Sequence, residues 1–156
     1  MNPPLRTQAD VQGVIEGLRD GTLDCVATDH APHAAYEKDR EFMIAPFGIH
    51  GLETSLALGI TYLVKPGHLS LVQLVEKMAT MPARILNLPG GTLGVGSSAD
   101  VTVFSTETSW TVNADSFVSK GKNTPFGGWN LTGRTVATFV GGEQVFERSE
   151  TARSAS

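Results

Sequence analysis

The sequence has little that would link it to an oxidising compartment, a membrane or a polyanion. Its 156 residues include one cysteine, Cys25, which cannot form an intramolecular disulfide. No basic segment precedes an apolar stretch at the start, and no run reaches the ~18 apolar residues that a membrane span requires. The net charge is −4 and the Lys and Arg residues are scattered, so neither nucleic acid nor an anionic membrane is an expected partner. We expect a cytoplasmic protein with Cys25 as a small buried apolar residue.

The residues that are present suit a folded α/β chain, and 40% of them are hydrophobic. Thr7 and Asp10 resemble a capping box, and apolar residues follow at positions 11, 14, 15 and 18 before Gly21. This pattern predicts a helix with one buried face. Residues 24–28 (DCVAT) lack polar alternation, which favours a strand covered on both sides in a parallel sheet.

Further helices are predicted before the composition changes near residue 90. One spans residues 52–64, with core positions expected at Leu52, Leu56, Tyr62 and Leu63. Another begins after Ser70, with Gln73 in the reciprocal capping position, and residues 82–88 add a short helix. The apolar stripe of the helix after Ser70 comprises Leu71, Leu74, Val75 and Met78.

From Gly90 onward the chain is rich in Gly, Ser, Thr and Val, and this segment is expected to be β-rich. Residues 100–104 alternate, as do residues 135–146 across a Gly141-Gly142 turn. One parallel strand cannot form a sheet alone, so the helical half looks incomplete as an independent domain.

The motif TDHAPH at residues 28–33 is the strongest chemical signal, because it directly follows the predicted strand. The carboxyl ends of strands are where (β/α) barrels build their active sites. Asp29 there could ligate a metal and exchange a proton with a metal-bound hydroxide. The same residues are also compatible with Asp29 as the N-cap of a turn and with surface histidines.

Two more segments carry candidate contacts for a ligand. Asn2 offers an amide that both donates to and accepts from a planar imide-like substrate, although an Asn before two prolines also suits a simple turn. Residues 46–51 (PFGIHG) end a loop in which glycine permits close approach of the backbone to a ligand.

Together these segments resemble the ordered C-terminal signatures of dihydroorotases in the amidohydrolase superfamily. The resembling segments are NPPLR at 2–6, ATDHAPH at 27–33, PFGIHGLET at 46–54, GTLGVG at 91–96 with ADV at 99–101, and NTPF at 123–126 with Gly128, Trp129 and Gly133. The resemblance implies the C-terminal part of a (β/α)8 TIM barrel in residues 1–89, holding its last two strands and helices. A β-rich subdomain segment is expected in residues 90–148 and a disordered tail in residues 149–156.

The resemblance also implies roles for individual residues. Asp29 matches the catalytic aspartate, which contacts the metal site and moves a proton between the hydroxide and the ring nitrogen. His33 matches a histidine that binds the substrate carboxylate, and Asn2 matches a substrate-contacting asparagine. Phe47 and Gly48 match the stretch whose backbone meets the pyrimidine ring.

Three histidines have no catalytic match in the family. His30 is expected to be structural, because neighbouring side chains on an extended segment point in opposite directions. An aliphatic residue is usual in the family at the position of His50, which we expect to pack in the interior or to be partly exposed. His68 is expected in a loop.

The activity implied by the resemblance is reversible, zinc-dependent hydrolysis of (S)-dihydroorotate to N-carbamoyl-L-aspartate in de novo pyrimidine biosynthesis. One or two zinc ions are implied, together with a homo-oligomer or association with aspartate transcarbamoylase. One alternative is a non-catalytic dihydroorotase-like subunit that scaffolds aspartate transcarbamoylase, although the retention of the aspartate, the histidine and the asparagine argues against it. The other alternative is a hydantoinase or allantoinase, whose sequences usually differ after the Asp-His pair.

The His-x-His pair that supplies zinc ligands in this family has no counterpart in the sequence. A (β/α)8 barrel needs ~250 residues, which exceeds the length of this chain. We therefore expect a fragment that is inactive alone and prone to self-association through uncovered apolar surface.

Overall fold

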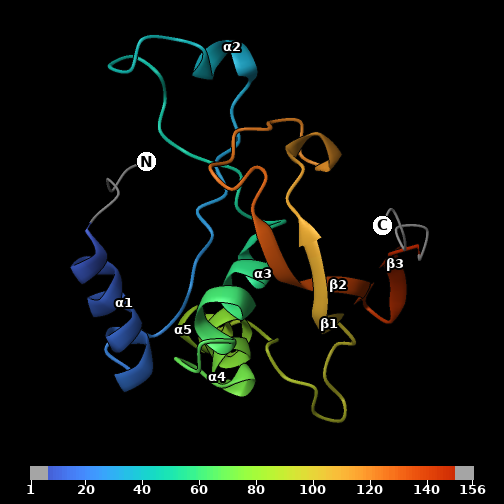
Figure 1. Cartoon of the computed structure of the whole chain (residues 1–156). Helices are drawn as coiled ribbons and strands as arrows, with labels where there is room; N and C mark the ends of the chain where they lie inside the picture. The colour runs from blue at the N-terminus through green and yellow to red at the C-terminus, as the bar shows by residue number, and fades with distance from the viewer. Residues whose placement is uncertain (1–6, 150–156) are drawn as a thin grey trace.

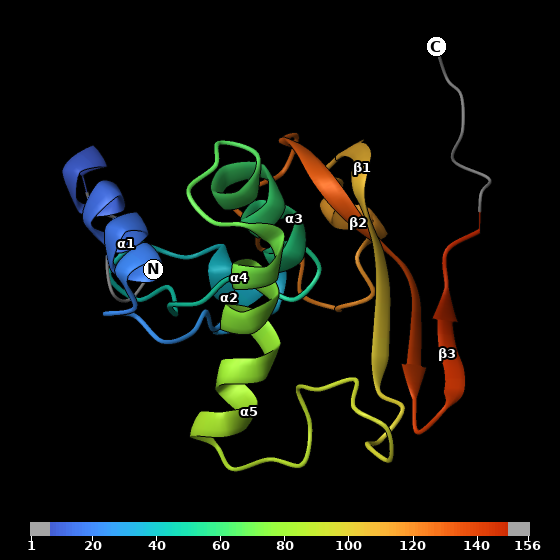
Figure 2. The same ribbon diagram turned by 90° about the horizontal axis from the view of Figure 1, so that it is seen from below.

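The computed structural model describes residues 7–149, so Asn2 lies outside the described residues, as do residues 150–156 of the expected tail. Figures 1 and 2 show a central group of helices with a small sheet on one side and helix α1 on the other. The loop that carries α2 (Ala35–Lys38) projects away from this body (Figure 1). No helix within residues 7–149 is both long enough and apolar enough to cross a bilayer.

Helix α1 (Gln8–Asp20) begins at the predicted capping box. The Thr7 hydroxyl accepts from the Asp10 backbone N–H at 3.4 Å, and the Asp10 carboxylate accepts from the Thr7 N–H at 3.0 Å. The predicted buried face is largely wrong, because Val11 and Val14 are 44% and 52% exposed and burial is confined to Gly17 and Leu18. The reason is visible in Figure 2, where α1 stands apart from the central helices.

The central helices change between α and π geometry along their length. Helix α3 (Ser55–Gly59) continues into the π-helix η1 (Ile60–Val64). Helix α4 (Leu71–Val75) continues through a second π-helix, η2 (Glu76–Thr80), into α5 (Met81–Ile85), so the short helix expected at 82–88 is the end of a longer one. The predicted cap is confirmed, since the Ser70 hydroxyl accepts from the Gln73 N–H at 3.2 Å.

The buried positions of these helices differ from the predicted stripes. Leu52 and Tyr62 are 61% and 48% exposed, whereas Ala57, Gly59 and Ile60 are buried. The helix presents its small residues to its neighbours, because a side chain at Gly59 would meet Leu74 at 2.8 Å. Of the stripe predicted after Ser70, Leu74 is buried and Val75 is exposed.

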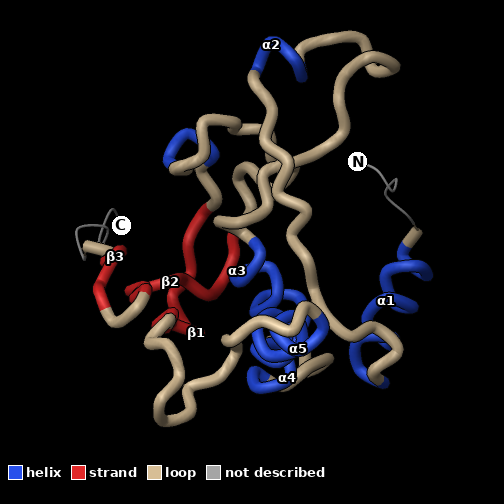
Figure 3. The backbone as a smooth tube through the Cα atoms, turned by 180° about the vertical axis from the view of Figure 1, so that it is seen from behind, coloured by secondary structure: helices blue, strands red, loops and turns tan. Residues whose placement is uncertain are grey.

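The β-rich segment forms an antiparallel sheet in the order β1-β2-β3, as Figure 3 shows in red. Strand β1 (Val101–Thr111) pairs with β2 (Asn130–Val140), and β3 (Glu143–Glu147) returns beside β2 after the predicted Gly141-Gly142 turn. The short 3-10 helix η3 (Ala114–Ser116) lies in the connection between β1 and β2.

The core lies where α3 meets one end of this sheet. Its buried members are Ala57, Val112, Phe117 and Leu131. Thr61 on the adjoining helical turn ties the two parts further, because its hydroxyl accepts from the Thr132 N–H at 2.8 Å. The helical half and the β-rich half therefore share one interior, and the segment between β1 and β2 is held against the helices.

The strand predicted at residues 24–28 is absent. Residues 24–29 form neither a helix nor a ladder, and Cys25, predicted to be buried, is exposed. A parallel strand needs hydrogen-bonding neighbours along its length, and within residues 7–149 the only parallel bridge near this segment joins His30, just after it, to Ile49. The described residues thus form an α/β structure whose sheet is antiparallel.

Candidate functional site

Segments 28–33 and 46–51 lie side by side. Besides the His30–Ile49 bridge, the Ala31 N–H donates to the Ile49 carbonyl at 3.0 Å. Gly51 reaches so close to Thr28 that a Cβ there would lie 2.7 Å from the Thr28 carbonyl oxygen. Glycine at this position therefore allows the two candidate segments to meet.

Asp29 is exposed at the start of this contact. Its backbone has a φ of 41°, a left-handed conformation that Asp tolerates better than most residues. Within residues 7–149 its carboxylate makes no hydrogen bond and no ion pair. Such a carboxylate is available to take a proton or to coordinate a cation.

His30 anchors the second segment to the first. Its Nδ1 accepts from the Gly51 N–H at 3.2 Å and from the Leu52 N–H at 3.4 Å. Both backbone N–H groups therefore hold the imidazole against the start of the helix that follows Gly51. This geometry agrees with the structural role predicted for His30.

His33 and Gly48 meet across the two segments. Gly48 has a φ of 113°, and a Cβ there would lie 2.6 Å from Ala31 Cβ and 3.3 Å from His33 Nε2. The His33 side chain remains partly accessible and its Nδ1 lies 3.7 Å from a carboxylate oxygen of Glu37. The imidazole and the Gly48 backbone thus form one continuous surface.

Asn123, from the connection between β1 and β2, joins both segments. Its side-chain oxygen accepts from the His33 backbone N–H at 3.0 Å, and its side-chain nitrogen donates to the Gly48 carbonyl at 2.9 Å. Its own carbonyl accepts from the His50 N–H at 2.8 Å. The Gly48 carbonyl also accepts from the Lys38 ammonium at 3.1 Å, while the adjacent Phe47 side chain is 62% exposed.

His50 is fully buried beneath this surface. Its ring stacks on Phe117 with centroids 4.2 Å apart and meets the edge of His30 at 4.8 Å. Nε2 lies 3.2 Å from the Glu53 carboxylate without hydrogen-bond geometry, so neither ring nitrogen has a hydrogen-bond partner within residues 7–149. Burial lowers the pKa of His50 against the opposing effect of Glu53, and the ring is therefore neutral at physiological pH.

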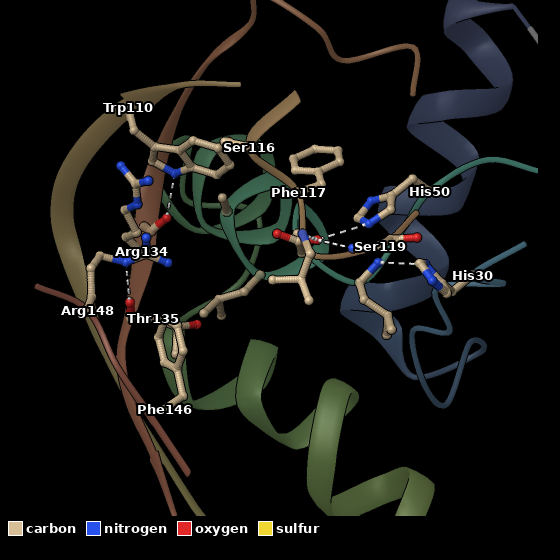
Figure 4. Close-up of a pocket in the computed structure, with 16 residues that line it drawn as sticks. His30, His50, Trp110, Ser116, Phe117, Ser119, Arg134, Thr135, Phe146 and Arg148 are labelled. Carbon is tan, nitrogen blue, oxygen red and sulfur yellow. Dashed lines mark hydrogen bonds and ion pairs between the residues drawn. The ribbon is translucent and has the colours of Figure 1, made fainter. Parts of the chain in front are cut away.

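A hollow of about 560 Å³ opens between these histidines and the sheet (Figure 4). Arg134 and Arg148 lie at the sheet side, where the Arg134 guanidinium stands 4.8 Å from the centre of the Trp110 ring. Glu53 lies at the opposite side and accepts from the Val118 N–H at 2.8 Å. None of the predicted site residues within 7–149 lines this hollow, so it adds no group to their arrangement.

The described residues offer few side chains that could bind the zinc implied by the family resemblance. Catalytic zinc sites use three protein ligands as a rule. No cluster of three or more His, Cys, Asp or Glu residues in the described part of the chain could hold a metal ion. Asp29 suits the role of one ligand, because it is exposed and ionisable, but these residues alone do not compose a metal site.

The structure therefore joins some of the predicted residues and leaves others apart. It places His33 against Gly48, with Phe47 next to Gly48 in the sequence, while Asp29 is an exposed residue four positions before His33. Asn2 lies outside the described residues. Asn123 had no predicted role, and its only signal in the sequence was its place in the NTPF motif.

The chain is similar in sequence to a known enzyme family and to several of its members. The amidohydrolase family model matches residues 3–145. The dihydroorotases of Clostridioides difficile and Acetivibrio thermocellus are 55% and 53% identical over 94% and 93% of this chain. The chain spans 34% of the length of each, which is about a third.

Solved structures of hydantoinases share the same backbone arrangement. L-Hydantoinase (dihydropyrimidinase) from Arthrobacter aurescens matches with a TM-score of 0.88 at 37% identity, covering 95% of this chain and 34% of that one. D-Hydantoinase (dihydropyrimidinase) from Thermus sp. matches with a TM-score of 0.86 at 29% identity, covering 94% of this chain and 33% of that one.

Proposed function

Because the chain belongs to the amidohydrolase family, we propose that it is the C-terminal third of a dihydroorotase. The observation that carries this proposal is the 53–55% identity to dihydroorotases across more than nine tenths of the chain. Identity to the L-hydantoinase structure is lower, at 37% over a similar share. The TDHAPH motif also favours dihydroorotate over hydantoin or allantoin as substrate.

The proposed reaction is hydrolysis of a ring amide. A water-derived oxygen bonds to the ring carbonyl carbon of dihydroorotate, the carbon–nitrogen bond breaks, and the nitrogen gains a proton to give N-carbamoyl-L-aspartate. Asp29 would take the proton from the attacking water and return it to the departing nitrogen. Its support is an exposed carboxylate without a partner among residues 7–149, since a general base must be free to reach the substrate.

The neighbouring residues would bind and orient the substrate. His33 offers an imidazole of partial exposure to the substrate carboxylate, and Phe47 with Gly48 offers an accessible ring and backbone beside it. Asn2, outside the described residues, remains a proposed contact to the pyrimidine ring. In synthesis of dihydroorotate the same groups would act in the reverse direction.

Zinc, as one or two ions, belongs to the proposal as well. Zinc supplies a Lewis acid and lowers the pKa of a bound water. Asp29 would be the ligand from this chain, with the remaining ligands provided outside residues 7–149. A complete (β/α)8 barrel, a cytoplasmic location, and a homo-oligomer or association with aspartate transcarbamoylase are further parts of this proposal.

A hybrid enzyme tests the function directly. The matching 146 residues of the C. difficile dihydroorotase would be replaced by the corresponding residues of this chain. We expect the hybrid to open dihydroorotate in preference to hydantoin and allantoin, and the isolated chain to turn over none of them. A folded hybrid that prefers hydantoin would support a hydantoinase, and one that opens no ring would support a non-catalytic subunit.

A further inference from the structure

The side chain of Asn123 bridges two segments that lie 90 and 75 residues before it in the sequence. One bond fixes the backbone of His33 and the other fixes the carbonyl of Gly48, at 3.0 Å and 2.9 Å. A side-chain amide is one of the few groups that present a donor and an acceptor on the same rigid plane. The chemistry of the two partners also settles which atom of the amide faces which segment.

The backbone around Asn123 also contacts both segments. Its carbonyl accepts from the His50 N–H, and the preceding Gly121 packs on the first segment. A Cβ at Gly121 would lie 2.6 Å from Pro32 Cβ and 3.0 Å from the His33 carbonyl oxygen. The position of the Asn123 amide is therefore fixed by the packing of Gly121 on the first segment and by the hydrogen bond from the His50 N–H of the second.

The two segments also meet at the bridge between His30 and Ile49, at the hydrogen bond from the Ala31 N–H to the Ile49 carbonyl, and where the Gly51 and Leu52 N–H groups donate to the His30 ring. These contacts hold the backbone at Ala31 and Ile49, whereas the His33 N–H and the Gly48 carbonyl are held by the Asn123 side chain, with the Lys38 ammonium also donating to the Gly48 carbonyl. Among residues 7–149, Asn123 alone bonds both His33 and Gly48. Loss of either bond would let the imidazole of His33 and the backbone of Gly48 move relative to one another.

We propose that Asn123 is a positioning residue that sets the spacing of His33 and Phe47-Gly48 for substrate binding. This inference rests on the proposed function for its substrate, but the bridge itself does not. Asn123 touches no reacting atom in this scheme. Its effect reaches the substrate through the two segments that it holds.

The bridge is tested first in the full chain without any substrate. Amide hydrogen exchange by NMR would compare the His33 N–H in the wild type, Asn123→Ala and the isosteric Asn123→Asp. We expect Asn123→Ala to speed exchange of that amide about tenfold, while Asn123→Asp, which keeps an acceptor, retains most of the protection. Equal exchange in Asn123→Ala and wild type would overturn the bridge.

The positioning role is then tested by kinetics in the hybrid enzyme. Asn123→Asp places an oxygen against the Gly48 carbonyl, and we expect it to raise KM for dihydroorotate about tenfold or more with a smaller change in kcat. Asn113→Asp is the matched control, because the Asn113 side chain only accepts, from the Asp115 N–H at 3.0 Å. It should leave both constants unchanged.

The outcomes separate the two proposals. An unchanged KM in Asn123→Asp, within an active hybrid, would overturn the positioning role. A wild-type hybrid without dihydroorotase activity would overturn the proposed function and with it the substrate role, while faster His33 exchange in Asn123→Ala would still establish the bridge.

Discussion

His50 lies face to face with Phe117, with ring centroids 4.2 Å apart and an angle of 22° between the rings. The imidazole is 0% exposed, and neither of its nitrogens has a hydrogen-bond partner within residues 7–149. A buried polar group without a partner costs about 1–3 kcal/mol of stability. The stacking on Phe117 and the contact with His30 keep the ring in place despite this cost.

Replacement of His50 by leucine should stabilise the chain. The leucine fills a similar volume beside Phe117 and carries no polar atom, so we expect the free energy of unfolding to rise by about 1 kcal/mol at pH 8. Urea denaturation followed by circular dichroism measures the change. His50→Ala is the control, because it removes the polar atoms but leaves a cavity and should destabilise the chain. A leucine variant less stable than wild type would show that the contact of Nε2 with the Glu53 carboxylate, at 3.2 Å, outweighs the cost of burying the imidazole.

The same residue should make stability depend on pH. Burial lowers the pKa of His50 from its ordinary value of 6.5, so below that pH the unfolded state binds more protons than the folded state. Stability is then full above pH 6.5 and falls as the pH drops toward the lower pKa of the folded state. We expect the Tm of the wild type to fall more between pH 7.5 and pH 5 than that of His50→Leu. Parallel curves would contradict this assignment.

Gly133 of β2 packs directly against the buried Ile60 of the central helices. It has a φ of 104°, and a Cβ there would lie 2.5 Å from Cδ1 of the buried Ile60. We expect Gly133→Ala to lower the free energy of unfolding by about 2–4 kcal/mol through backbone strain and overpacking. Gly127→Ala is the matched control, since nothing lies within 4 Å of a Cβ at that position. Equal melting temperatures for the two variants would be inconsistent with this packing.

Cys25 should react with a thiol reagent in the native state. Cys25 was predicted to be buried, whereas the structure exposes it on a segment without ladder neighbours. We expect titration with an aromatic disulfide to modify one thiol in native buffer at a rate close to that in denaturant. A thiol that reacts only after unfolding would indicate that this segment is covered, for example by self-association.

These results show which features of the fold could be predicted from the sequence. The capping boxes at Thr7 and Ser70 and the turn at Gly141-Gly142 involve residues a few positions apart, and all three were confirmed. The strand at residues 24–28 and the buried face of α1 required neighbours elsewhere, and residues 7–149 do not provide them. Local sequence patterns predict where a helix or turn begins, but whether a helix face is buried or a strand forms depends on the residues that pack against it.

In the candidate site, too, some residues could be predicted from the sequence, whereas the long-range contacts could not. His33 and Gly48 were predicted from motifs, and the structure brings them into contact. The bridge through Asn123 spans 75 and 90 residues, and nothing in the spacing of NTPF indicated its partners. His50 stood out as unusual for its position in the family, but its complete burial depends on Phe117, which lies far along the chain.

The most direct test of the central claim is the activity of Asp29→Asn in the hybrid enzyme with dihydroorotate. Asparagine keeps the shape of the side chain but cannot take a proton, so we predict that kcat/KM falls about 100- to 10,000-fold. Asp39→Asn, which alters an exposed carboxylate after α2, should have no effect. Full activity of Asp29→Asn in a folded hybrid would contradict the assignment of Asp29 as the general base.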